Sequence, residues 1–509
     1  MINFETISIV VIVASMSFIL QIWPRLKNRY FGIDTWRFLL LADYIRQHKK
    51  FPDVIRNAYI IETPMDNPPL LPLILSFFKK KWMDRNQGFV SPVFDIITNI
   101  SVFIISFLLT KDYVTSFLAQ IIYSLTTVVT LEASNLSLRT LSNLIFSWTV
   151  VFSIFYAQIE IWPYFILAVL FLVLLSYTHR MSVQVLFFLF IGLTIWSRDV
   201  TYLVIFFVGI FLSVFLFNGY YLRFLRGHLL MISFWMYNIQ NRLAHQIRGN
   251  PSRKNKHVDF VRRVEYLIWK IPVLPLLGPN LWNILVFIFT GLYFLDHDFL
   301  MPFPNLIFTA FMQWSIILFI AAIIFNLKHL RFLGEGQRYL EYATVPSAIV
   351  SASLLRSAWL NKNTSMLAVW IIFVGVGIGL VSLILIIFFQ RKLVLDNPDK
   401  SVTQDLWNVI DYLNAQKEQV RIACIPYGLS DALAYFLKNK RVLLSDNSVG
   451  VWELRDFWPL IKRPLQEIAD KYNLNFFLVS SNYVGVDEIK IVTFKKVFEK
   501  GPYVLLRRG

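Results

Sequence analysis

The chain has 509 residues, of which 56% are hydrophobic and 47 are phenylalanine, and its mean hydropathy is +0.56. A soluble domain of this length cannot bury so much apolar side chain in one core, so the composition excludes a soluble protein. The formal net charge is +17, but the basic residues are scattered through the loops between apolar runs, which argues against a nucleic-acid partner and favours contact with membrane lipids.

Apolar runs near the ~20 residues needed to cross hydrocarbon recur along most of the chain. The first, Phe4–Trp23, has neither a basic leader nor a small-residue cleavage site, so we predict an uncleaved anchor. Together the runs predict an α-helical polytopic protein of the cell membrane with about eleven transmembrane helices. These spans are expected near residues 4–23, 90–110, 113–130, 140–157, 162–178, 183–197, 200–217, 281–295, 304–325, 342–358 and 366–390.

Two long stretches, 24–89 and 218–280, are predicted not to span. An apolar run at 229–239 is too short to cross and is expected in the membrane interface or against the helix bundle. From about Arg391 predicted helices alternate with strands, which indicates a small C-terminal α/β domain over 391–509 after a membrane domain over 1–390. No catalytic constellation is evident in the C-terminal domain, and the lone Cys424 excludes a disulfide framework.

The most informative segment follows the first span and reads FGIDTWRFLLLADYIRQHKKFPD from Phe31, then DNPPLLPLILSFF from Asp66. Asp34 precedes a predicted helix, Trp36–Gln47, and two interpretations stay open. Its carboxylate is a good helix N-cap, because it can accept a backbone N–H two or three residues on. Alternatively, it is a general base at the membrane surface that takes a proton from an attacking hydroxyl. The apolar residues of the helix, including Trp36 and Leu39, indicate that it lies in the membrane interface.

The order of these motifs resembles that of GT-C type integral-membrane glycosyltransferases, in particular prokaryotic members that use polyprenyl-phosphate sugars (the Rgt, ArnT and PMT-like superfamily). The likeness covers about residues 1–390, and four further segments fit it. They are SPVFDIIT at 91–98, SLRTLSNLIFSW at 137–148, SYTHRMSVQ at 176–184 and GEGQRYLEYATVP at 334–346. The chain lacks the WWD-type tripeptide of oligosaccharyltransferase catalytic subunits, which argues against transfer of an oligosaccharide en bloc.

The resemblance implies transfer of a sugar from a polyprenyl-phosphate donor to an acceptor, which is a protein, lipid or polysaccharide, on the outer face of the membrane. It implies that Asp34 is the catalytic base. A leaving phosphate needs positive charge, which arginine supplies through its planar fork. The candidates for this role are Arg139, Arg180 and Arg338, with His179; the candidates for a second carboxylate are Asp66, Asp95 and Glu132. For each arginine, an interfacial anchor is the alternative.

The resemblance and the distribution of charged residues predict opposite orientations in the membrane. The resemblance implies a cytoplasmic amino terminus and an extracytoplasmic C-terminal domain, whereas the positive-inside rule places the amino terminus outside, because the loops predicted to face outward hold nearly all Lys and Arg. Two other functions also stay open: a transporter or flippase of lipid-linked sugars, and a polysaccharide polymerase or ligase of another membrane fold. No nucleotide-binding motif is present, and a D-x-D at 296–298 is expected to be a solvated turn. No cofactor is indicated, and a dependence on a divalent cation is left open.

Overall fold

The computed structural model describes residues 4–216, 219–242, 244–249, 274–295, 297–300, 306–444 and 447–509. The chain forms two compact units, each assembled from three segments. We call Met1–Lys27, Gly88–Tyr221 and Ile271–Lys392 the helical unit. We call Asn28–Gln87, Leu222–Lys270 and Leu393–Gly509 the mixed unit.

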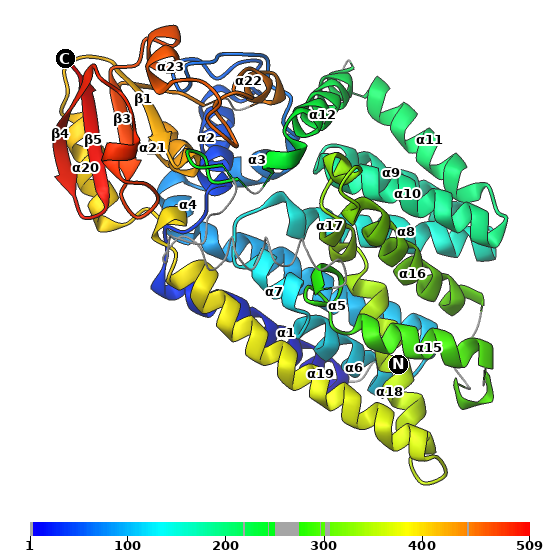
Figure 1. The fold of residues 1–509 in the computed structure, drawn as a ribbon. Helices are drawn as coiled ribbons and strands as arrows, with labels where there is room; N and C mark the ends of the chain where they lie inside the picture. The colour runs from blue at the N-terminus through cyan, green and yellow to red at the C-terminus, as the bar shows by residue number, and fades with distance from the viewer. Residues whose placement is uncertain are drawn as a thin grey trace. The chain divides into compact units, whose positions relative to one another are not determined.

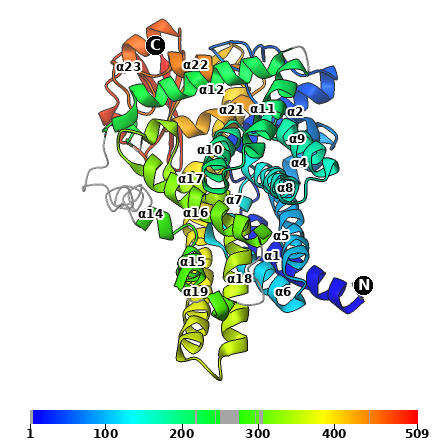
Figure 2. The same cartoon turned by 90° about the vertical axis from the view of Figure 1, so that its right-hand side faces the viewer.

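The helical unit is a bundle whose helices pack through apolar faces and small polar side chains. Helix α1 runs beside α5, and α18 runs beside both α6 and α19 (Figures 1 and 2). The Gln390 amide at the end of α19 donates to the Leu20 carbonyl of α1 at 2.8 Å, which ties the two long helices together. The helices are α1 (Phe4–Lys27), α5 (Val90–Thr110), α6 (Tyr113–Ser124), α7 (Thr127–Ala133), α8 (Leu138–Ile159), α9 (Trp162–Ser176), α10 (Arg180–Ser197), α11 (Thr201–Phe215), α14 (Leu274–Leu277), α15 (Asn283–Leu295), α16 (Leu306–Asn326), α17 (Gly336–Glu341), α18 (Thr344–Asn361) and α19 (Met366–Gln390).

Six helices of the described part of the chain are long and apolar enough to cross a membrane, or up to eight when each of two bent pairs counts as one span. This confirms the predicted polytopic helical architecture. The figure of about eleven spans stays a prediction, because α9 has 15 residues and α15 has 13, fewer than the ~20 that span hydrocarbon at 1.5 Å per residue.

The span expected over 113–130 is broken into α6 and α7, which meet at an angle of 58°. The break falls at Thr126, whose backbone is extended, within a run of β-branched residues that disfavours helix. The break frees the Ser124 carbonyl, which accepts a hydrogen bond from the Thr130 hydroxyl at 3.2 Å. A side-chain partner of this kind allows a helix to break inside apolar surroundings.

The mixed unit contains a five-stranded sheet in the order β2-β1-β3-β5-β4, as expected for the C-terminal α/β domain. Strand β1 (Val420–Ile425) pairs in parallel with β2 (Lys440–Val442) and β3 (Phe476–Ser480), whereas β5 (Tyr503–Arg508) pairs antiparallel with β3 and with β4 (Phe494–Lys500). The predicted strand at 441–446 runs into residues 445 and 446, which lie outside the described residues. The helices of this unit are α2 (Asp34–His48), α3 (Leu70–Ser76), α4 (Lys80–Asn86), α12 (Tyr220–Tyr237, from Leu222 on), α20 (Gln404–Asn414), α21 (Ser430–Phe436), α22 (Ser448–Glu453) and α23 (Leu465–Lys471).

The first long loop groups with the C-terminal sheet, which differs from the predicted division at residue 390. The Ile60 N–H donates to the Val442 carbonyl at 2.8 Å, so the loop extends the sheet beside β2. Ile61 is buried in the core that covers this sheet. The division differs because backbone pairing between distant segments leaves no local signal in the sequence.

Helix α2 packs against α21 inside the mixed unit, so protein covers much of the apolar face that was predicted to lie in the membrane interface. Trp36 is 1% exposed, and its ring lies 4.8 Å from that of Phe436 and 5.8 Å from that of Tyr435, both on α21. The amphipathic pattern was therefore identified, but the partner of its apolar face is protein.

Candidate functional site

A cluster of arginine and glutamate side chains lies in the helical unit, where several helices begin or end. Glu132 comes from the last turn of α7, Arg139 from the first turn of α8, and Glu335, Arg338 and Glu341 from α17 and its N-cap. Glu335 and Glu341 lie three residues on either side of Arg338 and can therefore reach it along the helix. The fold thus brings together three of the predicted site residues, Glu132, Arg139 and Arg338.

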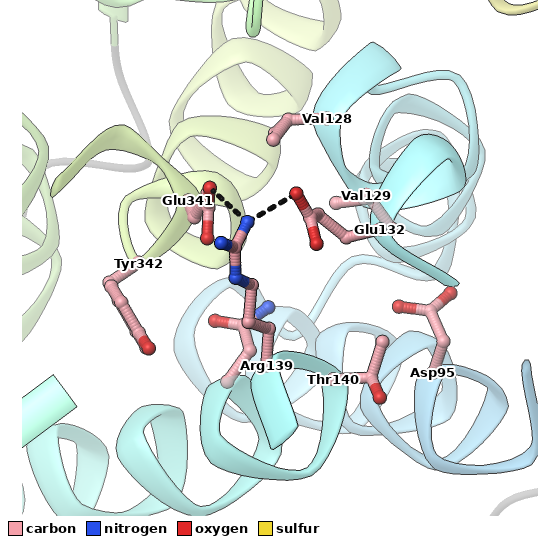
Figure 3. A pocket seen from close by; sticks show the side chains of 9 residues that line it. Asp95, Val128, Val129, Glu132, Arg139, Thr140, Glu341 and Tyr342 are labelled. Carbon is pink, nitrogen blue, oxygen red and sulfur yellow. Dashed lines mark hydrogen bonds and ion pairs between the residues drawn. The ribbon is translucent and has the colours of Figure 1, made fainter. Parts of the chain in front are cut away.

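Each guanidinium of the cluster is shared between carboxyl groups. Arg139 pairs with Glu132 and, at 3.3 Å, with Glu341 (Figure 3). Arg338 pairs with Glu132 at 3.4 Å, Glu341 at 3.2 Å and Glu335 at 3.1 Å. Two guanidinium groups therefore face three carboxyl groups, and the formal charge of the five groups is −1 when all are ionised.

The cluster borders a small pocket. Glu132, Arg139 and Glu341 line it together with Asp95 and Tyr342, and its volume is about 20 Å³, roughly the space of one water molecule. Burial raises the pKa of Glu341 to about 8, with further increases from Glu132 and Glu335 and a decrease from Arg139. Sequence reasoning missed Glu341 and Glu335, although both lie in the segment GEGQRYLEYATVP that it singled out.

His179 and Arg180 reach the same end of the bundle, where α10 begins. Nδ1 of His179 lies 3.1 Å from the Tyr342 hydroxyl, which in turn lies 3.0 Å from the Ser142 hydroxyl. His179 is thereby linked to Tyr342, the neighbour of Glu341. Arg180 is partly buried at the first position of α10.

Asp95 is held by hydrogen bonds that link three helices. It is 2% exposed and accepts bonds from the Gln21 amide of α1 and, at 2.7 Å, from the Tyr123 hydroxyl of α6. Figure 3 shows its carboxyl apart from the Arg139 guanidinium, on the far side of the pocket. This satisfied acid joins α1, α5 and α6, and its predicted role as a second catalytic carboxylate stays a prediction.

Asp34 lies in the mixed unit and does not act as a helix cap. Helix α2 begins at Asp34 itself, after the N-cap Ile33, and no side chain caps it. The Asp34 carboxyl is 56% exposed and lies 3.5 Å from the Arg37 guanidinium. The capping alternative is therefore wrong.

A buried acid of the C-terminal segment lies near the same arginine. Asp431, on α21, is 5% exposed and lies 3.5 Å from the Tyr59 hydroxyl. Burial raises the pKa of Asp431 to about 7; the charge of Arg37 opposes this shift and that of Asp34 adds to it. Sequence reasoning assigned no chemistry to the C-terminal domain, because the proximity of Asp431 to Arg37 depends on the packing of α2 against α21.

Asp66 lines a separate pocket of about 460 Å³ in the mixed unit. Its carboxylate is buried and accepts the Ser448 N–H at 3.1 Å. Arg223 and Arg226 of α12 line the same pocket, and Arg223 pairs with Asp53 at 2.7 Å. The lining of the pocket therefore combines carboxylate and guanidinium groups with apolar side chains.

Within the described ranges, no three His, Cys, Asp or Glu side chains are placed to hold a metal ion. Asp296 of the D-x-D motif lies outside those ranges.

Comparison with known proteins identifies the fold. The chain matches no family model and no curated protein sequence. It is similar to the archaeal oligosaccharyltransferase AglB from Archaeoglobus fulgidus, solved with an inhibitory peptide and a dolichol-phosphate, at a TM-score of 0.59 and 11% identity over 94% of this chain and 69% of that one. It is also similar to ArnT from Cupriavidus metallidurans bound to undecaprenyl phosphate, at a TM-score of 0.51 and 10% identity over 99% and 97% of the two chains. The chain therefore has the GT-C fold of polytopic membrane glycosyltransferases, as its motifs predicted.

Proposed function

We propose that this protein is a glycosyltransferase that moves a sugar from a polyprenyl-phosphate donor to an acceptor on the outer face of the cell membrane. The observation that carries the proposal is the fold, which the chain shares over nearly its whole length with two proteins solved with polyprenyl phosphates. The arginines at one end of the helical unit add the chemistry that a lipid phosphate requires.

In this proposal Asp34 is the general base. Its carboxylate is exposed to solvent and so can reach an acceptor hydroxyl, and the Arg37 guanidinium lies 3.5 Å from it. The acceptor oxygen forms a bond to the anomeric carbon as the bond from that carbon to the phosphate oxygen breaks. The proton passes to Asp34, and the electron pair leaves with the polyprenyl phosphate.

Arg139 and Arg338 are proposed to bind the lipid phosphate, with His179 and Arg180 beside them. A phosphate that gains charge as it leaves is stabilised by guanidinium groups in a poorly solvated place. The side chains of Arg139 and Arg338 are about one-quarter exposed, which limits screening by water.

The test is transfer by the purified chain in nanodiscs, supplied with a panel of polyprenyl-phosphate hexose and pentose donors together with protein, lipid and polysaccharide acceptors, and assayed for release of polyprenyl phosphate. We expect release from at least one donor and a loss of about 10²–10⁴-fold in Asp34→Asn, the range that a general base contributes. Asp411→Asn is the matched control, because Asp411 is exposed on α20 of the same unit. Release from no donor, or an Asp34→Asn variant within a few-fold of wild type, would contradict the proposal.

A further inference from the structure

The arginine–glutamate cluster poses a problem for the binding of an anion. Arg139 and Arg338 are already paired with Glu132, Glu335 and Glu341, and these three carboxyl groups outnumber the two guanidinium groups. A phosphate that approaches the arginines meets a cluster whose formal charge is −1 when every group is ionised. Positive charge becomes available only when a carboxyl group is neutralised or moves away.

The small volume beside the cluster also indicates that a carboxyl group must move before a phosphate can bind. The pocket that Arg139, Glu132 and Glu341 share has room for about one water molecule, and a phosphate group is larger. The carboxyl groups therefore occupy the positions around the guanidinium groups where phosphate oxygens would bind. Binding of the phosphate requires at least one of them to give up its hydrogen bonds to arginine.

Glu341 is the carboxyl group best placed to do so. Glu335 pairs with Arg338 at 3.1 Å, whereas Glu341 lies within 3.3 Å of both arginines. Glu132 also contacts both arginines, but its side chain is 28% exposed and that of Glu341 is 12% exposed. Burial penalises the charge on Glu341 more strongly for that reason.

The charged and titratable groups around Glu341 shift its ionisation in opposite directions. Arg139 of α8 and Arg338 of α17 favour its ionised form, whereas Glu132 of α7 and Glu335 beside α17 disfavour it. Tyr342 follows it in the chain and joins it to His179, and Asp95 of α5 lines the same pocket. The balance raises the pKa of Glu341 to about 8, so a proton is available to this site near neutral pH.

We propose that Glu341 competes with the lipid phosphate for Arg139 and Arg338, and that the phosphate binds the form of the cluster in which Glu341 is protonated. This inference rests on the proposed function, because it takes a polyprenyl phosphate as the ligand of these arginines. The phosphate oxygens replace the carboxylate on the guanidinium groups, and a proton from solvent neutralises the displaced Glu341. Transfer converts the sugar-linked phosphodiester into a polyprenyl phosphate monoester, which carries a second negative charge. When Glu341 loses its proton, its carboxylate repels this charge and so favours release of the product.

The experiment is a titration of the purified full-length chain, in nanodiscs of zwitterionic lipid, with undecaprenyl phosphate between pH 7 and pH 9. A phosphate monoester has its second pKa near ~6, so the ligand keeps one charge state across this window. For wild type we expect the affinity to fall above pH 8, by at most about tenfold per pH unit, because one proton is linked to binding. For Glu341→Gln we expect no such fall, and binding about tenfold tighter than wild type at pH 9.

Two further variants sharpen the test. Glu160→Gln, at the opposite end of α8, makes the same charge change far along the helix from Arg139 and should behave as wild type. Glu335→Gln removes an anion that raises the pKa of Glu341, so the fall in affinity should begin at a lower pH. Glu335→Gln also keeps the test decisive if Glu341→Gln fails to fold.

The outcomes separate the two proposals. Wild-type binding whose pH dependence persists in Glu341→Gln overturns the role of Glu341 and leaves the phosphate site intact. Weaker binding by Glu341→Gln than by wild type at pH 9 also overturns that role. Absence of binding in wild type and in every variant overturns the assignment of the phosphate site itself.

Discussion

Asp34 and Asp431 show how position decides what two carboxyl groups near one arginine can do. Asp34 is exposed, whereas Asp431 is buried and its pKa is raised to about 7. Arg37 interacts with both acids. An exposed carboxylate is open to an incoming acceptor, while a buried acid whose pKa is raised by desolvation makes stability depend on pH.

Asp431→Asn should therefore reduce the pH dependence of stability. The native pKa of Asp431 is about 7 and its ordinary value is 3.8, so the folded protein binds more protons than the unfolded one between these values. This stabilisation is complete below pH 4 and is lost as the pH rises through 7, by at most about 4 kcal/mol at ~1.4 kcal/mol per pKa unit.

The measurement is the thermal unfolding midpoint of wild type and Asp431→Asn at pH 5 and pH 8. The decrease in midpoint between the two should be smaller in the variant, whereas Asp411→Asn, an exposed control on α20, should keep the wild-type decrease. An Asp431→Asn protein with an unchanged or larger decrease would show that Asp431 is not the titrating group.

At the residue scale, the sequence predicted part of each group of charged side chains and missed the rest. Arg139 and Arg338 were predicted because a leaving phosphate needs cations, and Glu132 was predicted as a candidate second carboxylate, but Glu335 and Glu341 were not predicted. Glu335 and Glu341 could have been found from their three-residue spacing around Arg338. Asp431 could not, because it is about 400 residues from Arg37 in the chain and only tertiary packing brings the two together.

At the scale of elements, α12 depends on a glycine where it passes the pocket of Asp66. A Cβ at Gly227 would clash with the Asp66 Oδ2, and the Asp66 carboxylate accepts a hydrogen bond from the Ser448 N–H. Gly227→Ala should therefore shift Asp66 and destabilise the protein by about 1–3 kcal/mol, the usual cost of overpacking.

The matched control is Gly377→Ala on α19, where a Cβ would meet no described atom within 4 Å. In a helix with free space, alanine is favoured over glycine by about 0.5–1 kcal/mol, so this variant should be neutral or slightly stabilised. Thermal unfolding of both variants checks the pair, and equal effects would show that the space around Gly227 is less tight than the structure has it.

The break between α6 and α7 and the burial of α2 show what hydrophobic pattern alone leaves open. Apolar periodicity identified both segments as helical, because length and composition are local properties. Apolar periodicity did not predict the break between α6 and α7, because the break depends on a side-chain partner, Thr130, for the freed Ser124 carbonyl. It also could not distinguish lipid from protein as the cover for Trp36, because both surroundings are apolar.

At the scale of the whole molecule, the two compact units interleave along the chain, so each unit is complete only when distant segments meet. The last segment of the mixed unit starts at Leu393, and the division of the chain into domains at residue 390 stays a prediction. The sequence did not show that residues 28–87 join the same unit, because this grouping depends on strand pairing such as that of Tyr59 with Val442.

The orientation in the membrane is the last property that the proposed function requires. Single cysteines at Lys50, exposed after α2, and at Asn363, exposed between α18 and α19, provide two reporters. The native Cys424 is fully buried and burial raises its pKa to about 12, so it should not react with an impermeant maleimide. We expect Lys50→Cys to be labelled in intact cells and Asn363→Cys only after lysis. The unsubstituted chain is the control and should stay unlabelled in both conditions. The opposite pattern would follow the positive-inside rule, place Asp34 on the cytoplasmic side and contradict transfer at the outer face.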